Sequence, residues 1–232
     1  MRYPKPTFIT NEIYHIYNRG VEKREIFLET ADYLRMIHNL YELNDKNATL
    51  NSEYHPKRNP GIEIYTENRA KESLVEILAF VLMPNHYHLI VREKEEGGVV
   101  RFMQKFGVGY AMYFNKIYDR VGPLFQGRFK ATHVKTEEYL RNLVGYVHTN
   151  PVELIDNYQN RTSTTIDQLK KYRWSSFSDY MGISNFPAVT SRGFILELMG
   201  GDRGVETSAE SWIVHRRDKK ATVPEIAGDR RR

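Results

Sequence analysis

The chain has 232 residues, 41% of them hydrophobic, which fits one domain with or without appendages and is enough apolar material for a core. Lysine and arginine outnumber aspartate and glutamate by 34 to 29, and the net charge of +5 favours an anionic partner such as nucleic acid. The absence of cysteine excludes disulfides, thiolate catalysis and cysteine-ligated zinc, and no apolar run suits a secretory signal or a membrane span, so we expect a soluble, cytoplasmic protein with no membrane contact.

The first third of the chain predicts a strand and a helix, followed by an irregular stretch. Residues 12–18 alternate between two faces, as a half-buried strand does. Residues 31–43 carry an apolar stripe at helical spacing, and Thr30 is a plausible N-cap. Residues 44–73 are rich in Asn, Lys, Glu and Pro without periodicity, which indicates an insertion or a long loop.

The middle of the chain predicts a hairpin and a long helix. Residues 74–83 are apolar on both faces, as expected of a central strand. The turn at Pro84-Asn85 links this strand to a second one at 86–92. Residues 99–118 are predicted to form the helix, with aromatic residues on one side.

The last third predicts a short strand at 129–134 and the most clearly delimited helix of the chain, at 137–150. Thr136 can cap this helix, acidic residues suit its first turn, and Pro151 stops it.

The order strand, helix, strand, strand, helix, strand, helix indicates an α+β sandwich. A ferredoxin-like or RRM-like antiparallel sheet with helices on one face fits this order best. We assign the domain to residues 1–180, where residues 172–180 pack back as an anchor. Residues 181–232 are a C-terminal extension, partly disordered, with a polar tail over 200–232.

Two histidines separated by one residue form the first candidate site. The period of a strand places His86 and His88 on one face, roughly 6 to 7 Å apart, so that their nitrogens can converge on one metal ion. Tyr87 and Leu89 then point to the opposite face, where they can pack under a helix. A His-x-His pair is also compatible with an ordinary polar strand face, and a metal site needs a third ligand from elsewhere. The remaining histidines considered are interpreted as isolated surface or structural residues: His15, His38, His55 and His215.

The helix at 137–150 carries the second candidate site. Asn142, Tyr146 and Asn150 are spaced by four and form a polar stripe beside an apolar one, so the Tyr146 hydroxyl and the Asn150 amide should face the same way. Beside the histidine strand, this face could supply a nucleophile and a third ligand together. The alternative is an ordinary boundary tyrosine and a helix-ending asparagine. His148 and Thr149 lie on other faces, where contact with DNA or solvent is expected.

Two sequence strings together resemble the single-tyrosine HUH transposases, which are the enzymes of small insertion sequences and the related REP-associated tyrosine transposases. The strings are MPNHYHLIV at residues 83–91 and GYVHTNPV at residues 145–152. Three further stretches are similar to family segments: YHIYNRG at 14–20, GPLFQGRFK at 122–130 and WSSF at 174–177. The resemblance extends roughly over residues 14–180.

The resemblance implies a ferredoxin-like fold, a divalent metal (Mg²⁺ or Mn²⁺) and DNA strand transfer through a 5′-phosphotyrosine. Carried across, His86 and His88 become metal ligands, Tyr146 the nucleophile and Asn150 the third ligand. Many insertion-sequence members have glutamine at the last position, and asparagine resembles the REP-associated branch. The middle residue of the histidine motif is usually aliphatic in the family, and Tyr87 departs from that pattern.

Such an enzyme would act on single-stranded or hairpin DNA as a monomer or homodimer, in the cytoplasm at the nucleoid. A basic cluster is expected to hold DNA phosphates, with a solvated basic face as the alternative. Its members are Lys116, Arg120, Arg128, Lys130 and Lys135. Tyr113, Tyr118 or Phe125 could stack on unpaired bases.

Two other functions stay open. One is a catalytically silent nucleic-acid-binding module of the same fold, against which the intact histidines, tyrosine and asparagine argue. The other is a metal hydrolase in which the tyrosine is incidental.

Overall fold

The computed structural model describes residues 7–47, 72–156, 158 and 162–218. Its four strands form one antiparallel sheet in the order β2-β3-β1-β4, with β1 and β3 at the centre. This is the strand order of a ferredoxin-like fold, so the predicted α+β class is confirmed. The strands are β1 (Ile13–Arg19), β2 (Val75–Met83), β3 (His86–Glu93) and β4 (Lys130–Val134).

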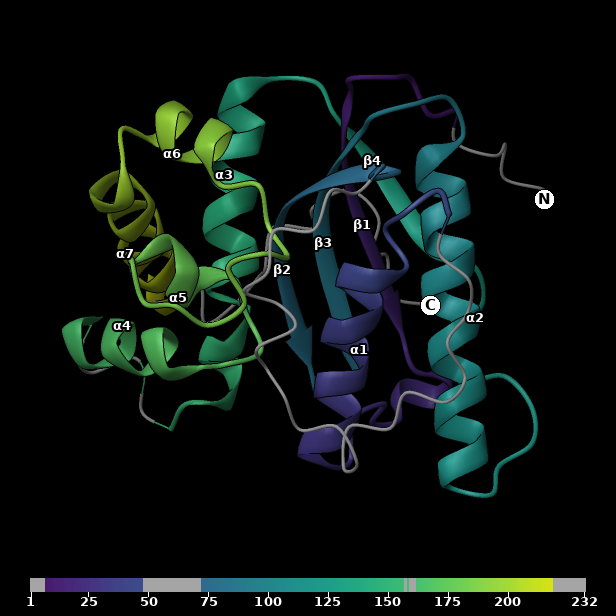
Figure 1. Ribbon diagram of the computed structural model, residues 1–232. Coiled ribbons are helices and arrows are strands. Elements are labelled where there is room, and N and C mark those ends of the chain that lie inside the picture. The colour runs from purple at the N-terminus through teal and green to yellow at the C-terminus, as the bar shows by residue number, and fades with distance from the viewer. Residues whose placement is uncertain (1–6, 48–71, 157, 159–161, 219–232) are drawn as a thin grey trace.

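Two long helices, α1 (Thr30–Glu42) and α2 (Gly98–Ile117), cover one face of the sheet (Figure 1). Their apolar sides and alternate strand residues build the larger core. Tyr87 lies on this face, where its ring packs edge-on against Phe106 of α2 at 5.3 Å between centroids. The predicted packing of Tyr87 under a helix is therefore confirmed.

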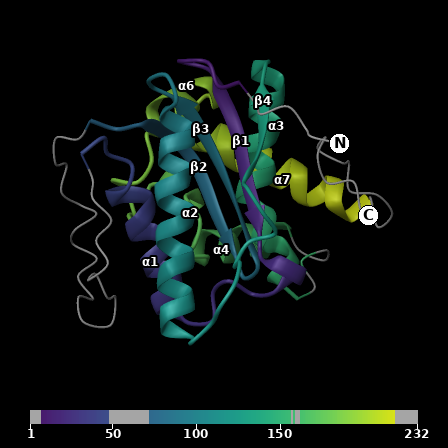
Figure 2. The same cartoon turned by 90° about the vertical axis from the view of Figure 1, so that its right-hand side faces the viewer.

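The opposite face of the sheet is covered as well, which the expectation of helices on one face did not include (Figure 2). Helix α3 (Glu137–His148) packs against β2 and β3, because both strands carry apolar residues on this face, such as Val81 and Ile90. Further helices pack outside α3 and β2. They are α4 (Thr162–Lys171), α5 (Phe177–Tyr180), α6 (Gly193–Met199) and α7 (Asp202–Asp218).

The predicted elements agree with the structure to within a few residues, with two local corrections. Thr30 is the first residue of α1, and Glu29 caps the helix instead. Helix α3 ends at His148, two residues earlier than predicted, and the 3-10 helix η3 (Asn150–Leu154) follows directly. A second 3-10 turn, η1 (Val21–Lys23), follows β1.

The predicted insertion at 44–73 falls largely outside the described residues, since 48–71 are not among them. Its two described ends meet, because the Lys46 amide donates to the Glu72 carbonyl at 3.0 Å.

The segment at 172–180 packs back on the sheet as predicted. The Leu82 amide donates to the Trp174 carbonyl at 2.8 Å, and the Ser176 amide donates to the Phe80 carbonyl at 3.0 Å. These bonds satisfy backbone groups at the outer edge of β2, which would otherwise remain unpaired.

The interpretation of residues 200–232 as a polar tail is wrong for Asp202–Asp218, which form α7. Val205, Ala209 and Ile213 recur every four residues and are buried in the second core. Helix α7 packs on α3, and residues 219–232 lie outside the described part of the chain. In the part that is described, no helix combines the length and apolar character needed to cross a membrane.

Candidate active site

The hairpin β2–β3 sets the direction of the two candidate ligands. His86 and His88 project from β3 toward α3, while Tyr87 and Leu89 between and beyond them enter the core under α1 and α2. The two imidazole centroids lie 5.1 Å apart. The predicted sharing of one strand face is therefore what the structure shows.

Helix α3 brings the second pair of candidates to the same place. Thr136 caps it as predicted, because its hydroxyl accepts a bond from the Tyr139 amide at 3.2 Å. The apolar stripe is buried against the sheet, which leaves Tyr146 half-buried at the edge of the contact. Asn150, in the first turn of η3, is only 3% exposed and faces the histidines.

Asn150 and His86 face each other at hydrogen-bonding distance, and the tautomer of His86 decides which atom donates. The Asn85 amide nitrogen donates to the Lys23 carbonyl at 3.1 Å, which turns the Asn85 oxygen toward His86 Nδ1, 2.6 Å away. A neutral His86 that donates from Nδ1 has a lone pair on Nε2, and this atom lies 3.1 Å from the Asn150 amide oxygen. Two facing lone pairs repel each other unless a proton or a cation lies between them.

A divalent cation fits this donor pair. Two adjacent ligands of an octahedral Mg²⁺, each about 2.1 Å from the ion, are about 3 Å apart, which matches the His86–Asn150 separation. Imidazole nitrogen and amide oxygen are both normal metal ligands, so His86, His88 and Asn150 could hold such an ion. Within the described residues, no group of three or more histidine, aspartate or glutamate side chains is placed to hold a metal.

His15 orients the second histidine, and the interpretation of His15 as isolated is wrong. His15 Nε2 lies 2.9 Å from His88 Nδ1, and both rings are buried. Burial lowers the pKa of His15 to about 4 and lowers the pKa of His88 well below its usual value. Both imidazoles are therefore neutral near pH 7, as a metal ligand must be, and the hydrogen bond at Nδ1 of His88 directs its Nε2 to a ligand.

Tyr146 is enclosed by rings and one cation. Its ring centroid lies 5.4 Å from that of His88 and 6.2 Å from that of His15. Helix α7 supplies the other side of the enclosure, with Trp212 at 5.6 Å and the Arg216 guanidinium at 5.7 Å from the tyrosine ring. The sequence does not predict this contribution, because the polar composition of residues 200–232 indicates a tail.

His148 and Thr149 do not contact solvent, contrary to expectation. Both are fully buried. His148 Nε2 bonds to the Ser176 hydroxyl at 3.0 Å, and the Thr149 hydroxyl donates to the Gly145 carbonyl at 2.7 Å. His148 fixes the end of α3 against the segment at 172–180, and Thr149 fixes the last turn of α3 itself, so both help to position Tyr146 and Asn150.

The predicted basic cluster extends from the end of α2 to the residue after β4. Lys116, Arg128, Lys130 and Lys135 are exposed, and Arg120 is half-buried beside Asn115. Lys130 lies close to the site, because its Nζ is 5.6 Å from the ring of Tyr17, which stacks on His88.

The three rings considered for base stacking are already engaged in the protein. Phe125 is buried in the core, and the hydroxyls of Tyr113 and Tyr118 both donate to Asp32. The expectation that they stack on bases is not supported by these contacts.

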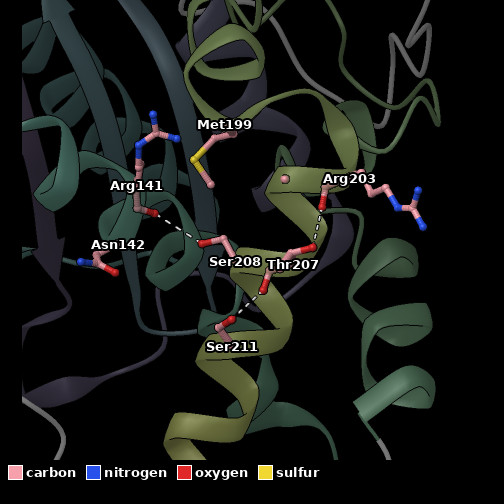
Figure 3. Close-up of a pocket in the computed structure, with 8 residues that line it drawn as sticks. Arg141, Asn142, Met199, Arg203, Thr207, Ser208 and Ser211 are labelled. Carbon is pink, nitrogen blue, oxygen red and sulfur yellow. Dashed lines mark hydrogen bonds between the residues drawn. The ribbon is translucent and has the colours of Figure 1, made fainter.

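A hollow of about 530 Å³ lies between α3 and the start of α7 (Figure 3). Arg141 and Asn142 line one side of it, and the hydroxyls of Thr207, Ser208 and Ser211 line the other. These hydroxyls donate to main-chain carbonyls, so they offer no donor to a ligand. The histidines and Tyr146 therefore remain the candidate site, and this hollow does not replace them.

A comparison with models of protein families shows to which family the chain belongs. The family model described as "Transposase IS200 like" matches residues 31–150, more than half of the chain. The chain belongs to the IS200-like transposase family. The region matched to the IS200-like transposases includes His86, His88, Tyr146 and Asn150, and it excludes β1 and α7.

Among solved structures, a REP-associated tyrosine transposase bound to a REP hairpin is similar to the chain, with a TM-score of 0.51 and 16% identity over 82% of this chain and 92% of that one. At this identity the likeness shows the shared fold alone. Comparison with curated proteins finds no match.

Proposed function

We propose that this IS200-like transposase is a metal-dependent single-stranded DNA endonuclease and strand transferase with Tyr146 as its nucleophile. The observation that carries the proposal is the convergence of one tyrosine, two imidazoles and one amide oxygen in a largely buried corner between β3 and α3.

The cleavage step forms a bond from Tyr146 Oη to phosphorus and breaks the bond from phosphorus to the 3′ oxygen. The phenol loses its proton and the released 3′ oxygen gains one, which leaves a 5′-phosphotyrosine and a free 3′-hydroxyl. Rejoining is the reverse attack by a 3′-hydroxyl, and it needs no ATP because the phosphotyrosine retains the energy of the broken linkage. A divalent ion held by His86, His88 and Asn150 would neutralise charge on a non-bridging phosphate oxygen.

The protein residues hold this arrangement in place before DNA binds. Asn85 and His15 fix the ring orientations of the two histidines. His148 and Thr149 fix the end of α3. Positioning of this kind lowers the barrier because reacting groups need not be ordered during the reaction.

Two observations support the proposed class of substrate: the exposed basic residues of this chain and the DNA bound in a similar solved structure. The exposed basic residues from Lys116 to Lys135 suit a phosphate backbone, and the similar solved structure holds a REP hairpin. We propose single-stranded or hairpin DNA as the substrate, and chromosomal DNA in the cytoplasm as the place of action. We also propose residues 1–180 as the transposase domain, to which α7 of the C-terminal extension adds one wall of the site.

A labelled single-stranded DNA bearing a hairpin, incubated with the protein and Mn²⁺, tests the proposal. We expect a covalent protein–DNA adduct on a denaturing gel, and its loss when EDTA is added. Binding without an adduct would favour a catalytically silent binding module, and free products without an adduct would favour a hydrolase.

A further inference from the structure

Arg19 is the last residue of β1 and lies directly opposite His86 in the register of β1 and β3. Side chains alternate along a strand, so Arg19 shares a face with His15 and Tyr17, and this face carries the histidine pair. Opposed residues of antiparallel strands have Cβ atoms about 4.5–5.5 Å apart. The Arg19 side chain therefore starts beside the His86 imidazole.

The Arg19 side chain is half-buried, and one of its hydrogen-bond donors has no acceptor among the described residues. Its Nε atom is buried and has no hydrogen-bond partner among the described residues. Its main chain is well fixed, because its amide donates to the Asn18 side chain and its carbonyl accepts from the Gln126 amide, each at 2.9 Å. A buried donor without a partner is costly, and an anion bound beside Arg19 would remove that cost.

Two guanidinium groups lie near the candidate metal site. Arg19 starts opposite His86 in the sheet, and the Arg216 guanidinium lies 5.7 Å from the ring of Tyr146. Arg216 is paired with Glu153 at 3.0 Å, whereas the buried Nε of Arg19 is unpaired. A guanidinium beside ligands for a divalent cation is unfavourable by itself. An anion bound between the Arg19 guanidinium and the divalent cation would make the arrangement favourable.

We propose that Arg19 is a catalytic residue that donates hydrogen bonds to a non-bridging oxygen of the scissile phosphate. The guanidinium offers several donors in a fixed plane that suits phosphate oxygens, and it transfers no proton. The attacked phosphorus group carries more negative charge in the transition state than in the diester, so the interaction strengthens as Tyr146 attacks. This inference rests on the proposed function and extends it to a residue outside the matched family region.

The test compares Arg19→Gln and Arg19→Lys with the wild type. Arg101→Gln is a matched control, because Arg101 lies on α2, away from the site, and pairs with Glu95. We expect Arg19→Gln to slow adduct formation about 100- to 1,000-fold, Arg19→Lys to slow it less, and Arg101→Gln to leave it unchanged. Adduct formation by the Arg19→Gln variant at the wild-type rate would overturn the proposal. A wild-type protein that forms no adduct would instead refute the proposed function.

Two binding measurements separate phosphate contact from a structural role. In a Tyr146→Phe background without added metal, a neutral methylphosphonate at the scissile linkage should weaken DNA binding about tenfold when Arg19 is present, and less than about twofold in Arg19→Gln. Equal weakening in both proteins would overturn the proposal. Mn²⁺ affinity without DNA should be unchanged or higher in Arg19→Gln, because a neighbouring positive charge is gone. A tenfold lower Mn²⁺ affinity would show that Arg19 only holds His86 in place.

Discussion

The contact between α3 and α7 can be tested by adding one methyl group at Gly145. A Cβ atom at this position would lie 2.3 Å from Trp212 Cδ1 and 2.5 Å from Ser208 Oγ, distances that the present packing cannot accept. Replacing glycine by alanine within a helix normally stabilises it by about 1 kcal/mol. Overpacking of a tight contact costs about 1–3 kcal/mol. We therefore expect Gly145→Ala to be neutral to destabilising, by up to about 2 kcal/mol.

A matched control is available in α2. A Cβ atom at Gly107 would meet no atom within 4 Å, so Gly107→Ala should show the helical gain of about 1 kcal/mol alone. Urea denaturation of both variants measures the difference, which we expect to be about 1–3 kcal/mol. A second substitution, Trp212→Ala, should remove much of the penalty of Gly145→Ala, because it removes the closest clashing atoms. Equal stabilisation by Gly145→Ala and Gly107→Ala would refute the packing of α7 on α3.

Two further predictions concern the metal and the DNA. His15→Ala should lower Mn²⁺ affinity about 10- to 100-fold, because His15 orients His88 through the bond at Nδ1. His133→Ala is the control, since it removes a histidine that pairs with Glu12, and it should leave Mn²⁺ affinity unchanged. Calorimetric titration measures both variants, and equal affinities would contradict the role of His15. Affinity for single-stranded DNA should fall steeply as the salt concentration rises. Lys130→Gln should make the plot of the logarithm of the binding constant against the logarithm of salt concentration less steep, by about 0.7. An affinity that does not change with salt would count against phosphate contacts.

Local sequence signals were sufficient where a structural element is determined by its own residues. The hairpin at Pro84-Asn85 and the helix capped by Thr136 have such signals, so the faces of His86, His88 and Tyr146 could be predicted. The convergence of these faces depends on the second core between β2, β3 and α3, which only the fold shows.

The remaining parts of the site come from pairings distant in sequence. His15 reaches His88 only through the register of β1 and β3, which a lone histidine in a strand pattern does not reveal. Helix α7 was missed because a few apolar residues at helical spacing, among them Val205 and Ala209, lie in a strongly polar stretch. Its packing needs the bare surface of Gly145, which is a property of α3 rather than of α7.

The identity of the nucleophile is the central claim, and a denaturing gel of protein–DNA adducts in Mn²⁺ tests it most directly. Tyr139 lies on the same helix as Tyr146, whereas the hydroxyls of Tyr110 and Tyr113 bond to Ile26 and Asp32 under the other face of the sheet. We predict that Tyr146→Phe abolishes the adduct and keeps folding and DNA binding, since the lost hydroxyl should change stability by only about 1 kcal/mol. The Tyr→Phe variants at 110, 113 and 139 should still form the adduct. An adduct that persists in Tyr146→Phe and disappears in one of the other three would contradict the assignment.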